Sequence, residues 1–386
     1  MSDALAIAEA LAPGFAGRAA AYDRDAAFPV DDFADIRESG LLGLMAPERL
    51  GGLGAGFADY ARVATALARG NGATALVFNM HASVTGALAT VPEDLARALG
   101  APASFFDYRD RVLSDAATGR LFLVAMSERV AGSRLSAMTT TYEPEGGGWR
   151  IRGHKTFCSG AGHADAYLVV AKSLDGERVS QFLVPAGAGL TVERTWDPLG
   201  MRATASDDLH LDVLAPADAL LGGVEGLAVL LAQVMPQWLV ASYAAVYVGV
   251  ARAAIDAAVE HLTARNLTGL PAVRARLGHA DAAVETAALT VLEAADRVDR
   301  APGEPDTNRW IYRAKLVAGE TAQSVAASLL EACGTSATRR GHPLERIYRD
   351  ARCGALHPAT SDVCADWLGM AALGLDPDNE AAVPRW

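Results

Sequence analysis

The chain is poor in cysteine and in positive charge, and both shortages restrict its function. Its 46 acidic residues outnumber 34 basic ones, for a net charge of -12, and no run of basic residues occurs. This balance opposes binding to nucleic acid or to an anionic membrane surface. The N-terminal segment lacks a charged region followed by an apolar core, and there is no Cys-x-x-Cys pair among Cys158, Cys333, Cys353 and Cys364. We therefore expect a cytoplasmic protein with reduced thiols.

One stretch is long and uncharged enough to suggest a membrane span. Residues 226–251 contain no Asp, Glu, Lys or Arg, which meets the length required to cross a bilayer. Gln233 and Pro236 interrupt it, and charge resumes at Arg252 in what reads as the same helix. We expect a buried bundle helix, around which the chain oligomerises, and no membrane span.

The remaining pattern predicts helices, then strands, then helices. With 386 residues, 51% of them hydrophobic, the chain can bury a large core and hold two or three subdomains. Apolar residues recur at helical spacing in 4–11 and 57–67, whereas a period of two begins at Leu121. This indicates a helical domain at 1–120, a β domain at 121–222 and a helical domain at 223–386. The predicted strands are Leu121–Val124, Thr139–Tyr142, Trp149–Ile151, Tyr167–Val170, Phe182–Val184 and Leu209–Leu211.

The sequence contains neither a metal-binding motif nor a phosphate-binding loop. The eight histidines form neither His-x-x-x-His nor His-Glu-x-x-His, so we expect no metal, with His154 and His163 as turn residues that face solvent. The run Gly146-Gly147-Gly148 lacks the Lys-Ser/Thr and the helix that a phosphate-binding loop requires.

Five motifs resemble, in order, the signatures of the acyl-CoA dehydrogenase superfamily, and together they span nearly the whole chain. They lie at 43–52, 125–133, 155–161, 198–202 and 349–351. The resemblance implies an α+β fold with a helical N-terminal domain, a β-barrel-like middle domain and a C-terminal four-helix bundle. It also implies a flavin between the middle domain and the bundle, and a homotetramer or homodimer.

The same resemblance assigns residues to the flavin. Met126, Ser127 and Ser133 would meet it through backbone or hydroxyl groups, and Phe157 and Ser159 would lie against its ring system. Two further motif positions imply flavin contacts, those of Gly334 and Thr360. The flavin is FAD or FMN. The departure of 265–271 from the family's FAD-binding pattern favours FMN or a transiently bound reduced flavin.

The base that a dehydrogenase of this family uses is missing. Removal of the proton α to a thioester carbonyl requires a carboxylate. The family pattern places Glu before Gly-Thr, whereas this chain has Pro358-Ala359-Thr360 there. A minority of members carry the Glu on the long bundle helix, where this chain offers only Gln233 and Gln237. An amide is not a base at neutral pH.

Three segments instead resemble the flavin-dependent monooxygenase branch, for example dibenzothiophene monooxygenase. His357 precedes Pro358, His81 follows Asn79-Met80, and Phe157-Cys158-Ser159 replaces the usual Trp-Ile/Val-Thr/Ser. By this resemblance His357 and Ser159 would donate hydrogen bonds to oxygen held as a peroxide at flavin C4a. His81 would act as acid or base toward the substrate.

Departures from both patterns leave the substrate open. The family's Gly-Ser-Asp is Gly132-Ser133-Arg134 here, and the monooxygenase asparagine before the flavin is Val124 or a neighbour. We expect a monooxygenase that acts on a small molecule or an acyl thioester, with a possible flavin reductase as partner. The alternatives are an acyl-CoA dehydrogenase with a relocated base, and a flavin-free binding or assembly protein.

Overall fold

The N-terminal part is helical, as the sequence predicts. The computed structural model describes residues 3–383. Helix α4 is buried nearly all round. The Asn71 side chain caps its N-terminus and accepts from the Ala73 N–H at 3.2 Å. The elements are α1 (Asp3–Asp25), α2 (Val30–Glu38), η1 (Leu41–Gly43), η2 (Glu48–Leu50), α3 (Phe57–Gly70), α4 (Gly72–Thr90), α5 (Glu93–Ala98) and α6 (Ala103–Ala117).

A seven-stranded sheet follows, in the order β1-β4-β2-β3-β7-β6, with β5 paired to β4. Strand β4 pairs in parallel with β1 and β2, and the other pairs are antiparallel. Six strands fall on the predicted runs; the seventh, β6, was not predicted because it is short and mostly exposed. The strands are β1 (Phe122–Ala125), β2 (Thr141–Glu145), β3 (Gly148–Lys155), β4 (Ala166–Ser173), β5 (Val179–Pro185), β6 (Leu190–Glu193) and β7 (Asp208–Ala215).

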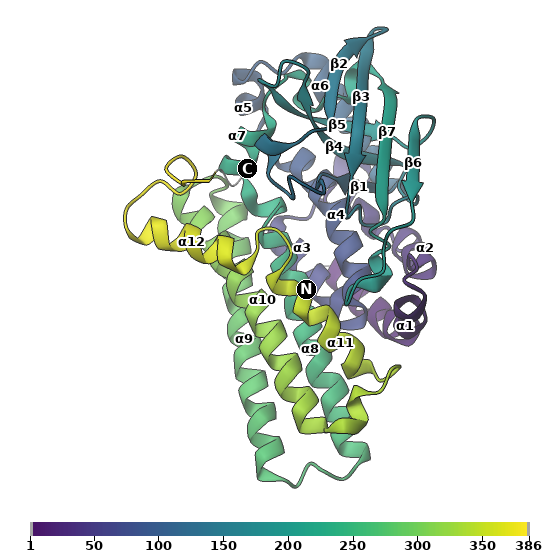
Figure 1. Ribbon diagram of the computed structural model, residues 1–386, viewed down its shortest axis with the longest axis vertical. Helices are drawn as coiled ribbons and strands as arrows, with labels where there is room; N and C mark the ends of the chain where they lie inside the picture. Colours follow the sequence, from purple (N-terminus) through teal and green to yellow (C-terminus); the bar gives the residue numbers. More distant parts are fainter. Residues whose placement is uncertain (1–2, 384–386) are drawn as a thin grey trace.

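The C-terminal part is helical, and its long helices α8, α9 and α10 run side by side (Figure 1). The α+β class and the order of the three parts are therefore confirmed, whereas the boundaries at 120 and 222 stay predictions. The elements are α7 (Ala228–Val234), η7 (Pro236–Trp238), α8 (Ala241–Ala264), α9 (Pro271–Arg300), α10 (Pro305–Cys333), η8 (Thr335–Thr338), α11 (Pro343–Arg352), η9 (Cys353–Ala355) and α12 (Ser361–Ala372).

The uncharged stretch 226–251 is not one helix, contrary to the sequence-based expectation. It forms α7, η7 and the first half of α8, since Pro236 has no N–H to continue α7. Within residues 3–383 one helical segment, Pro236–Ala264, is apolar and long enough to cross a membrane, but 72% of its apolar window is buried inside the protein. Its burial is that of a core helix, as predicted.

Two of the motifs meet where the bundle joins the rest of the chain. The Met201 N–H donates to Asp350 at 2.6 Å, and Arg349 donates to the Leu199 carbonyl at 2.9 Å. A Cβ on Gly200 would lie 2.2 Å from the Arg349 carbonyl oxygen, so this close approach requires glycine. Burial raises the pKa of Asp350 to about 6. These motifs therefore hold α11 against the loop that precedes β7.

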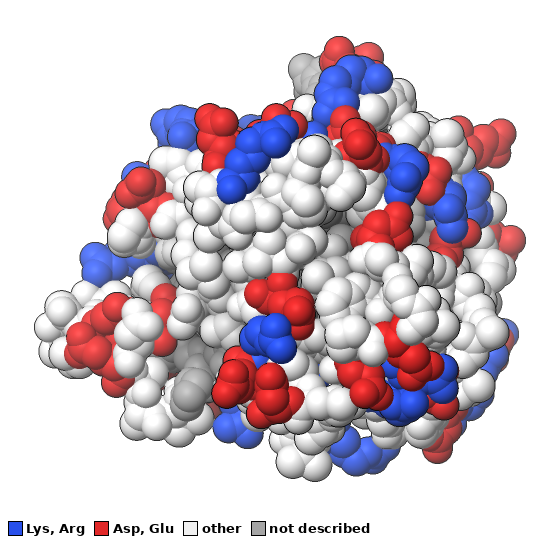
Figure 2. All heavy atoms as spheres, turned by 90° about the horizontal axis from the view of Figure 1, so that it is seen from above, with Lys and Arg blue, Asp and Glu red and all other residues white. Residues whose placement is uncertain are grey.

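Charges of both signs are interspersed on the end of the molecule that carries the sheet. Figure 2 shows Lys and Arg side chains alternating with Asp and Glu around uncharged areas on this face. No continuous basic surface is visible there, in keeping with the acidic composition.

Candidate functional site

The two segments expected to contact a flavin lie against each other. The Thr156 N–H donates to the Ser127 carbonyl at 2.8 Å, which joins the turn after β3 to the loop after β1. The Ser159 hydroxyl lies 3.0 Å from the Ser206 hydroxyl, and the Cys158 N–H donates to the Asp207 carbonyl at 3.1 Å. Ser159 is 8% exposed. The turn is thus fixed from two sides.

A buried ion pair also joins the two segments. Lys155 Nζ lies 2.8 Å from Glu128 Oε1, and both side chains are almost fully buried. Glu128 also accepts hydrogen bonds from the N–H groups of Thr139 and Thr140 at 2.7 and 3.0 Å. Burial alone would raise the pKa of Glu128, but Lys155 and the hydrogen bonds lower it to about 2. Glu128 therefore stays ionised, although burial lowers the pKa of Lys155, and the pair anchors the loop that carries Ser127.

Two apolar side chains of these segments are exposed to solvent. Phe157 is 66% exposed, has a left-handed backbone (φ 55°), and stands edge-on to Trp196 with ring centroids 5.9 Å apart. Val130 is 87% exposed, and the buried Thr156 Oγ1 has no hydrogen-bond partner. An exposed aromatic ring beside an unsatisfied hydroxyl fits a planar ligand with an apolar face and a polar edge.

The other expected flavin residues are less close together. Met126 is buried at the end of β1, and Ser133 is partly exposed in the same loop as Ser127. Thr360 caps α12 and accepts from the Val363 N–H at 3.4 Å. Gly334 ends α10, where its backbone groups bond within that helix and η8. Gly334 is thus placed among bundle helices, and its flavin contact stays a prediction.

A small apolar cavity of about 140 Å³ lies beside Met126. Helix α4 contributes Met80 and Ser83, and the segment from η7 to α8 contributes Trp238 and Tyr243. A Cβ on Gly86 would lie 2.1 Å from the Trp238 ring, so glycine lets this indole reach its place. No Asp, Glu, Lys, Arg or His is among the wall residues, which also include Val84, Ala87, Leu88, Phe105, Val124, Leu168, Gln181, Leu231, Met235 and Leu239. The sequence did not reveal this cavity, because its walls come from three separate regions.

His357 lies next to the cavity wall. Its Nδ1 is 2.7 Å from the Tyr247 hydroxyl, and its ring centroid is 5.4 Å from that of Tyr243, which lines the cavity. Burial, followed by the charge of the buried Lys315, lowers the pKa of His357 to about 3. His357 is therefore neutral, and among residues 3–383 its Nε2 has no hydrogen-bond partner.

His81 is built differently from the acid or base that we expected. Its Nε2 lies 2.7 Å from the Leu42 carbonyl oxygen, and its Nδ1 accepts from the Phe122 N–H at 3.1 Å. The side chain is 1% exposed, and burial lowers its pKa to about 4. Both ring nitrogens are thus occupied by the backbone. This geometry favours a structural role, in which His81 fixes α4 to η1 and β1, over the role predicted from the sequence.

Comparison with protein families matches most of the chain to the three domains of one family. Residues 6–97 match "Acyl-CoA dehydrogenase, N-terminal domain", residues 124–214 match "Acyl-CoA dehydrogenase, middle domain", and residues 241–362 match "Acyl-CoA dehydrogenase, C-terminal domain". The three matches follow the same order as the three structural parts.

Individual relatives include both oxygenases and dehydrogenases. L-evernosamine nitrososynthase of a Micromonospora species is 31% identical, over 95% of this chain and 89% of its own. The putative acyl-CoA dehydrogenase YdbM of Bacillus subtilis is 29% identical, over 94% of each chain. The crystal structure of FMN-bound TdsC, a dibenzothiophene monooxygenase of Paenibacillus sp. A11-2, is similar with a TM-score of 0.84 at 27% identity, over 96% of this chain and 97% of that one.

Proposed function

This chain belongs to the acyl-CoA dehydrogenase superfamily, and we propose that it is a flavin-dependent monooxygenase that acts on a small uncharged substrate. The observation that supports this function best is the absence of any carboxylate among the wall residues of the cavity beside Met126. The flavin is FMN or FAD, and FMN is favoured by the similar TdsC structure, which was solved with FMN bound.

A dehydrogenase reaction lacks its base in this cavity. The polar wall groups include the Ser83 hydroxyl, the Gln181 amide and the Tyr243 phenol. Burial raises the pKa of Tyr243 to about 12, and neither the amide nor the hydroxyl accepts a proton from carbon at neutral pH. Proton removal α to a thioester therefore has no acceptor among these residues.

The residues around Phe157 would hold the flavin. The exposed Phe157 ring and the unpartnered Thr156 hydroxyl offer an aromatic contact and a polar one, and Ser127 and Ser133 lie in the loop joined to that turn. Thr360 and Ser159 are further candidates. When bound in reduced form, the flavin supplies the electrons that activate molecular oxygen.

His357 would act as a fixed hydrogen-bond donor. If the Tyr247 hydroxyl donates to Nδ1, the neutral imidazole carries its proton on Nε2. A donor of this kind, next to a cavity lined by apolar side chains, stabilises negative charge on an oxygen that is being transferred. Tyr247 is then a positioning residue, because it selects the tautomer of His357.

The cavity favours a neutral substrate about the size of one aromatic ring. A cavity of roughly 150 Å³ lined by apolar side chains admits benzene, and this cavity measures about 140 Å³. A charged substrate group would lose its hydration against these walls without gaining a partner. An apolar heteroaromatic compound therefore fits better than the amino sugar named for some nitrososynthase relatives. Indole, present with FMN in a TdsC complex, is an uncharged probe of this chemistry; its second fused ring would extend toward the open side of the cavity.

Incubation of the purified chain with chemically reduced FMN, ¹⁸O₂ and indole tests this proposal. We expect an indole product that carries one ¹⁸O atom. Anaerobic reduction of bound flavin by butyryl-CoA would instead identify a dehydrogenase. Failure to bind either flavin would favour a binding or assembly protein. Gel filtration of the same sample would show whether it forms the expected homotetramer or homodimer, and added flavin reductase would replace the chemical reductant.

A further inference from the structure

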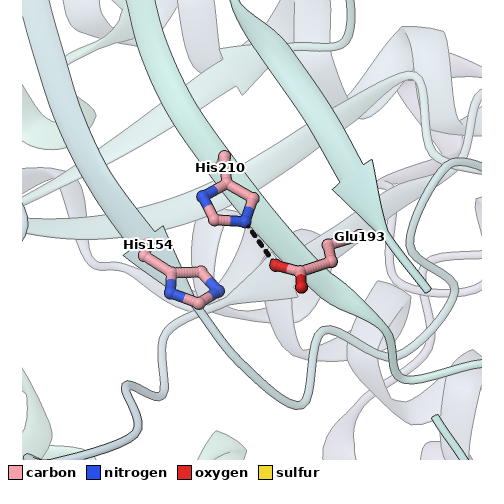
Figure 3. Close-up of side chains that lie close together, drawn as sticks. All are labelled: His154, Glu193 and His210. Atoms are coloured by element: carbon pink, nitrogen blue, oxygen red, sulfur yellow. Dashed lines mark hydrogen bonds and ion pairs between the residues drawn. The ribbon is translucent and has the colours of Figure 1, made fainter. Parts of the chain in front are cut away.

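Three strands of the sheet bring two histidines and a glutamate together on its outer face. His154 lies on β3, His210 on β7 and Glu193 on the edge strand β6, with their side chains close together (Figure 3). His210 Nε2 is 2.6 Å from Glu193 Oε2, and one ligand atom from each residue lies within 4.8 Å of the others. The two imidazole rings are stacked with centroids 4.1 Å apart.

The strand register explains why residues so far apart in the chain meet. His154 is paired directly with His210, and Glu193 is paired with Asp208, two residues from His210 along β7. Residues i and i+2 of a strand face the same side, as do paired residues of neighbouring strands. His154, His210, Glu193 and Asp208 therefore share one face. His154, which the sequence predicts in a turn, lies within β3 instead.

We propose that His154, His210 and Glu193 bind a divalent transition-metal ion of the Zn²⁺ type. Two imidazole nitrogens and one carboxylate are a ligand set that zinc uses, with the remaining position taken by water. Zinc–nitrogen bonds of about 2.0 Å require neighbouring ligand atoms roughly 3.3 Å apart. Small rotations of His210 and Glu193 achieve this, since both side chains are exposed. The metal replaces the proton that these two residues share.

A further carboxylate strengthens the site. Asp208 Oδ2 lies 3.0 Å from His154 Nε2, so it adds negative charge or a fourth ligand oxygen. The guanidinium of Arg129, 3.1 Å from the same carboxylate, opposes a cation, but its side chain is 72% exposed and can turn away. The negative charge of Asp208 and Glu193, together with the two imidazoles, outweighs the single positive charge of Arg129 and favours a bound cation.

We expect the metal to stabilise the segment that packs against Phe157. Asp208 accepts from the Thr195 hydroxyl at 3.0 Å, and Trp196, the next residue, packs against Phe157. A metal that links β6 to β7 and β3 would hold the Thr195–Trp196 segment in place. This inference does not depend on the reaction that the protein catalyses.

Calorimetric titration of the full-length chain, after chelator treatment, with ZnCl₂ tests the site, with and without added FMN. We expect one Zn²⁺ per chain and a higher thermal unfolding midpoint. Loss of a ligand weakens binding by at least the 10- to 100-fold known for outer contacts, so His210→Ala and Glu193→Gln should each lower the affinity by more than about tenfold. Both positions are exposed, so the variants should fold, which circular dichroism checks. Replacement of Zn²⁺ by Co²⁺ at the site should give visible absorption bands.

The control is His279→Ala, which removes an exposed histidine from α9 and should bind Zn²⁺ like the parent chain. A second pair, His261 and His342, has ring nitrogens 3.0 Å apart at the far end of the bundle. Loss of Zn²⁺ binding in His342→Ala but not in His210→Ala would overturn the proposal. So would a titration without saturable binding, or one unchanged by either substitution at the site.

Discussion

Arg349 and Asp23 form a bidentate ion pair although 326 residues separate them in the chain. Arg349 Nη1 and Nη2 lie 2.9 and 2.6 Å from the two Asp23 carboxylate oxygens, and Arg349 also contacts Glu345. Arg349 is 5% exposed. The pair fastens helix α1 to helix α11, so that the first and last thirds of the sequence are in direct contact.

We therefore expect Asp23→Asn to destabilise the protein by about 3 kcal/mol. Removing one partner of a buried ion pair leaves the other charge buried and uncompensated, which costs about 3–5 kcal/mol, and Glu345 remains to offset part of it. Urea unfolding followed by circular dichroism measures the change. The control Asp25→Asn, on the same helix but exposed, should leave the unfolding midpoint unchanged. Equal effects of the two substitutions would contradict this account.

A second prediction concerns the contribution of the Lys155–Glu128 pair to stability and to FMN affinity. Lys155→Met should cost about 3–5 kcal/mol, because Glu128 would be buried without its cation. The double variant Lys155→Met/Glu128→Gln should recover part of the loss, since it leaves no buried charge. FMN affinity, measured by fluorescence quenching, should fall in the single variant and return in the double one. A double variant less stable than the single would show that the pair itself, and not the unpaired carboxylate, decides stability.

His81 should make the protein labile to acid. Unfolded, it takes up a proton near pH 6.5, but burial holds its folded pKa at about 4. Stability is therefore unaffected above pH 6.5 and falls as the pH drops from 6.5 to 4. The difference between a pKa of 6.5 in the unfolded chain and about 4 in the folded one corresponds to roughly 3 kcal/mol at the end of that range.

His81→Gln tests both the titration and the structural role. An amide can donate to the Leu42 carbonyl and accept from the Phe122 N–H, so we expect a smaller loss of stability between pH 6.5 and 4. Some loss remains, because the pKa of His357 is lowered as well. Activity at pH 8 should stay within a few-fold of the parent. A fall in kcat of more than about 100-fold with unaltered stability would instead restore His81 as an acid or base.

His357→Ala should uncouple oxygen use from product formation. Removing one preorganised donor to a developing negative charge costs about 100- to 1000-fold in rate. We expect the indole product to fall by about 100-fold while hydrogen peroxide release per reduced FMN rises. Tyr247→Phe should have a smaller effect, about tenfold, because it only frees the tautomer of His357. His163→Ala, which removes an exposed histidine stacked on Phe28, is the control. An unchanged ratio of peroxide to product in His357→Ala would remove this residue from the mechanism.

Local patterns in the sequence predict most of the architecture. Alternating apolar residues located six strands, and helical spacing located the helices on either side. Strand β6 was not predicted, because its four residues are mostly exposed and show no alternation of buried and exposed side chains. The segment 226–251 looked continuous because hydrophobicity alone does not show where Pro236 ends the hydrogen bonding of α7.

The functional residues were predictable only where a motif carries them. The motifs assigned the segments that hold Ser127 and Phe157 to the same flavin, whereas the roles of individual histidines depend on partners far away in sequence. His81 matched a catalytic position, yet Leu42 and Phe122 occupy both its nitrogens. The histidines at 154 and 210 fit no metal motif, because only the register of β3 with β7 brings them together.

The composite wall of the cavity has a consequence for protein engineering. Met80, Met126 and Tyr243 come from three regions of the chain and face one small space. A mutant library confined to one region would alter a single side of that space. Efforts to redirect this chain to a new compound should therefore vary all three positions together, starting with the flexible methionines, whose side chains adapt to new shapes.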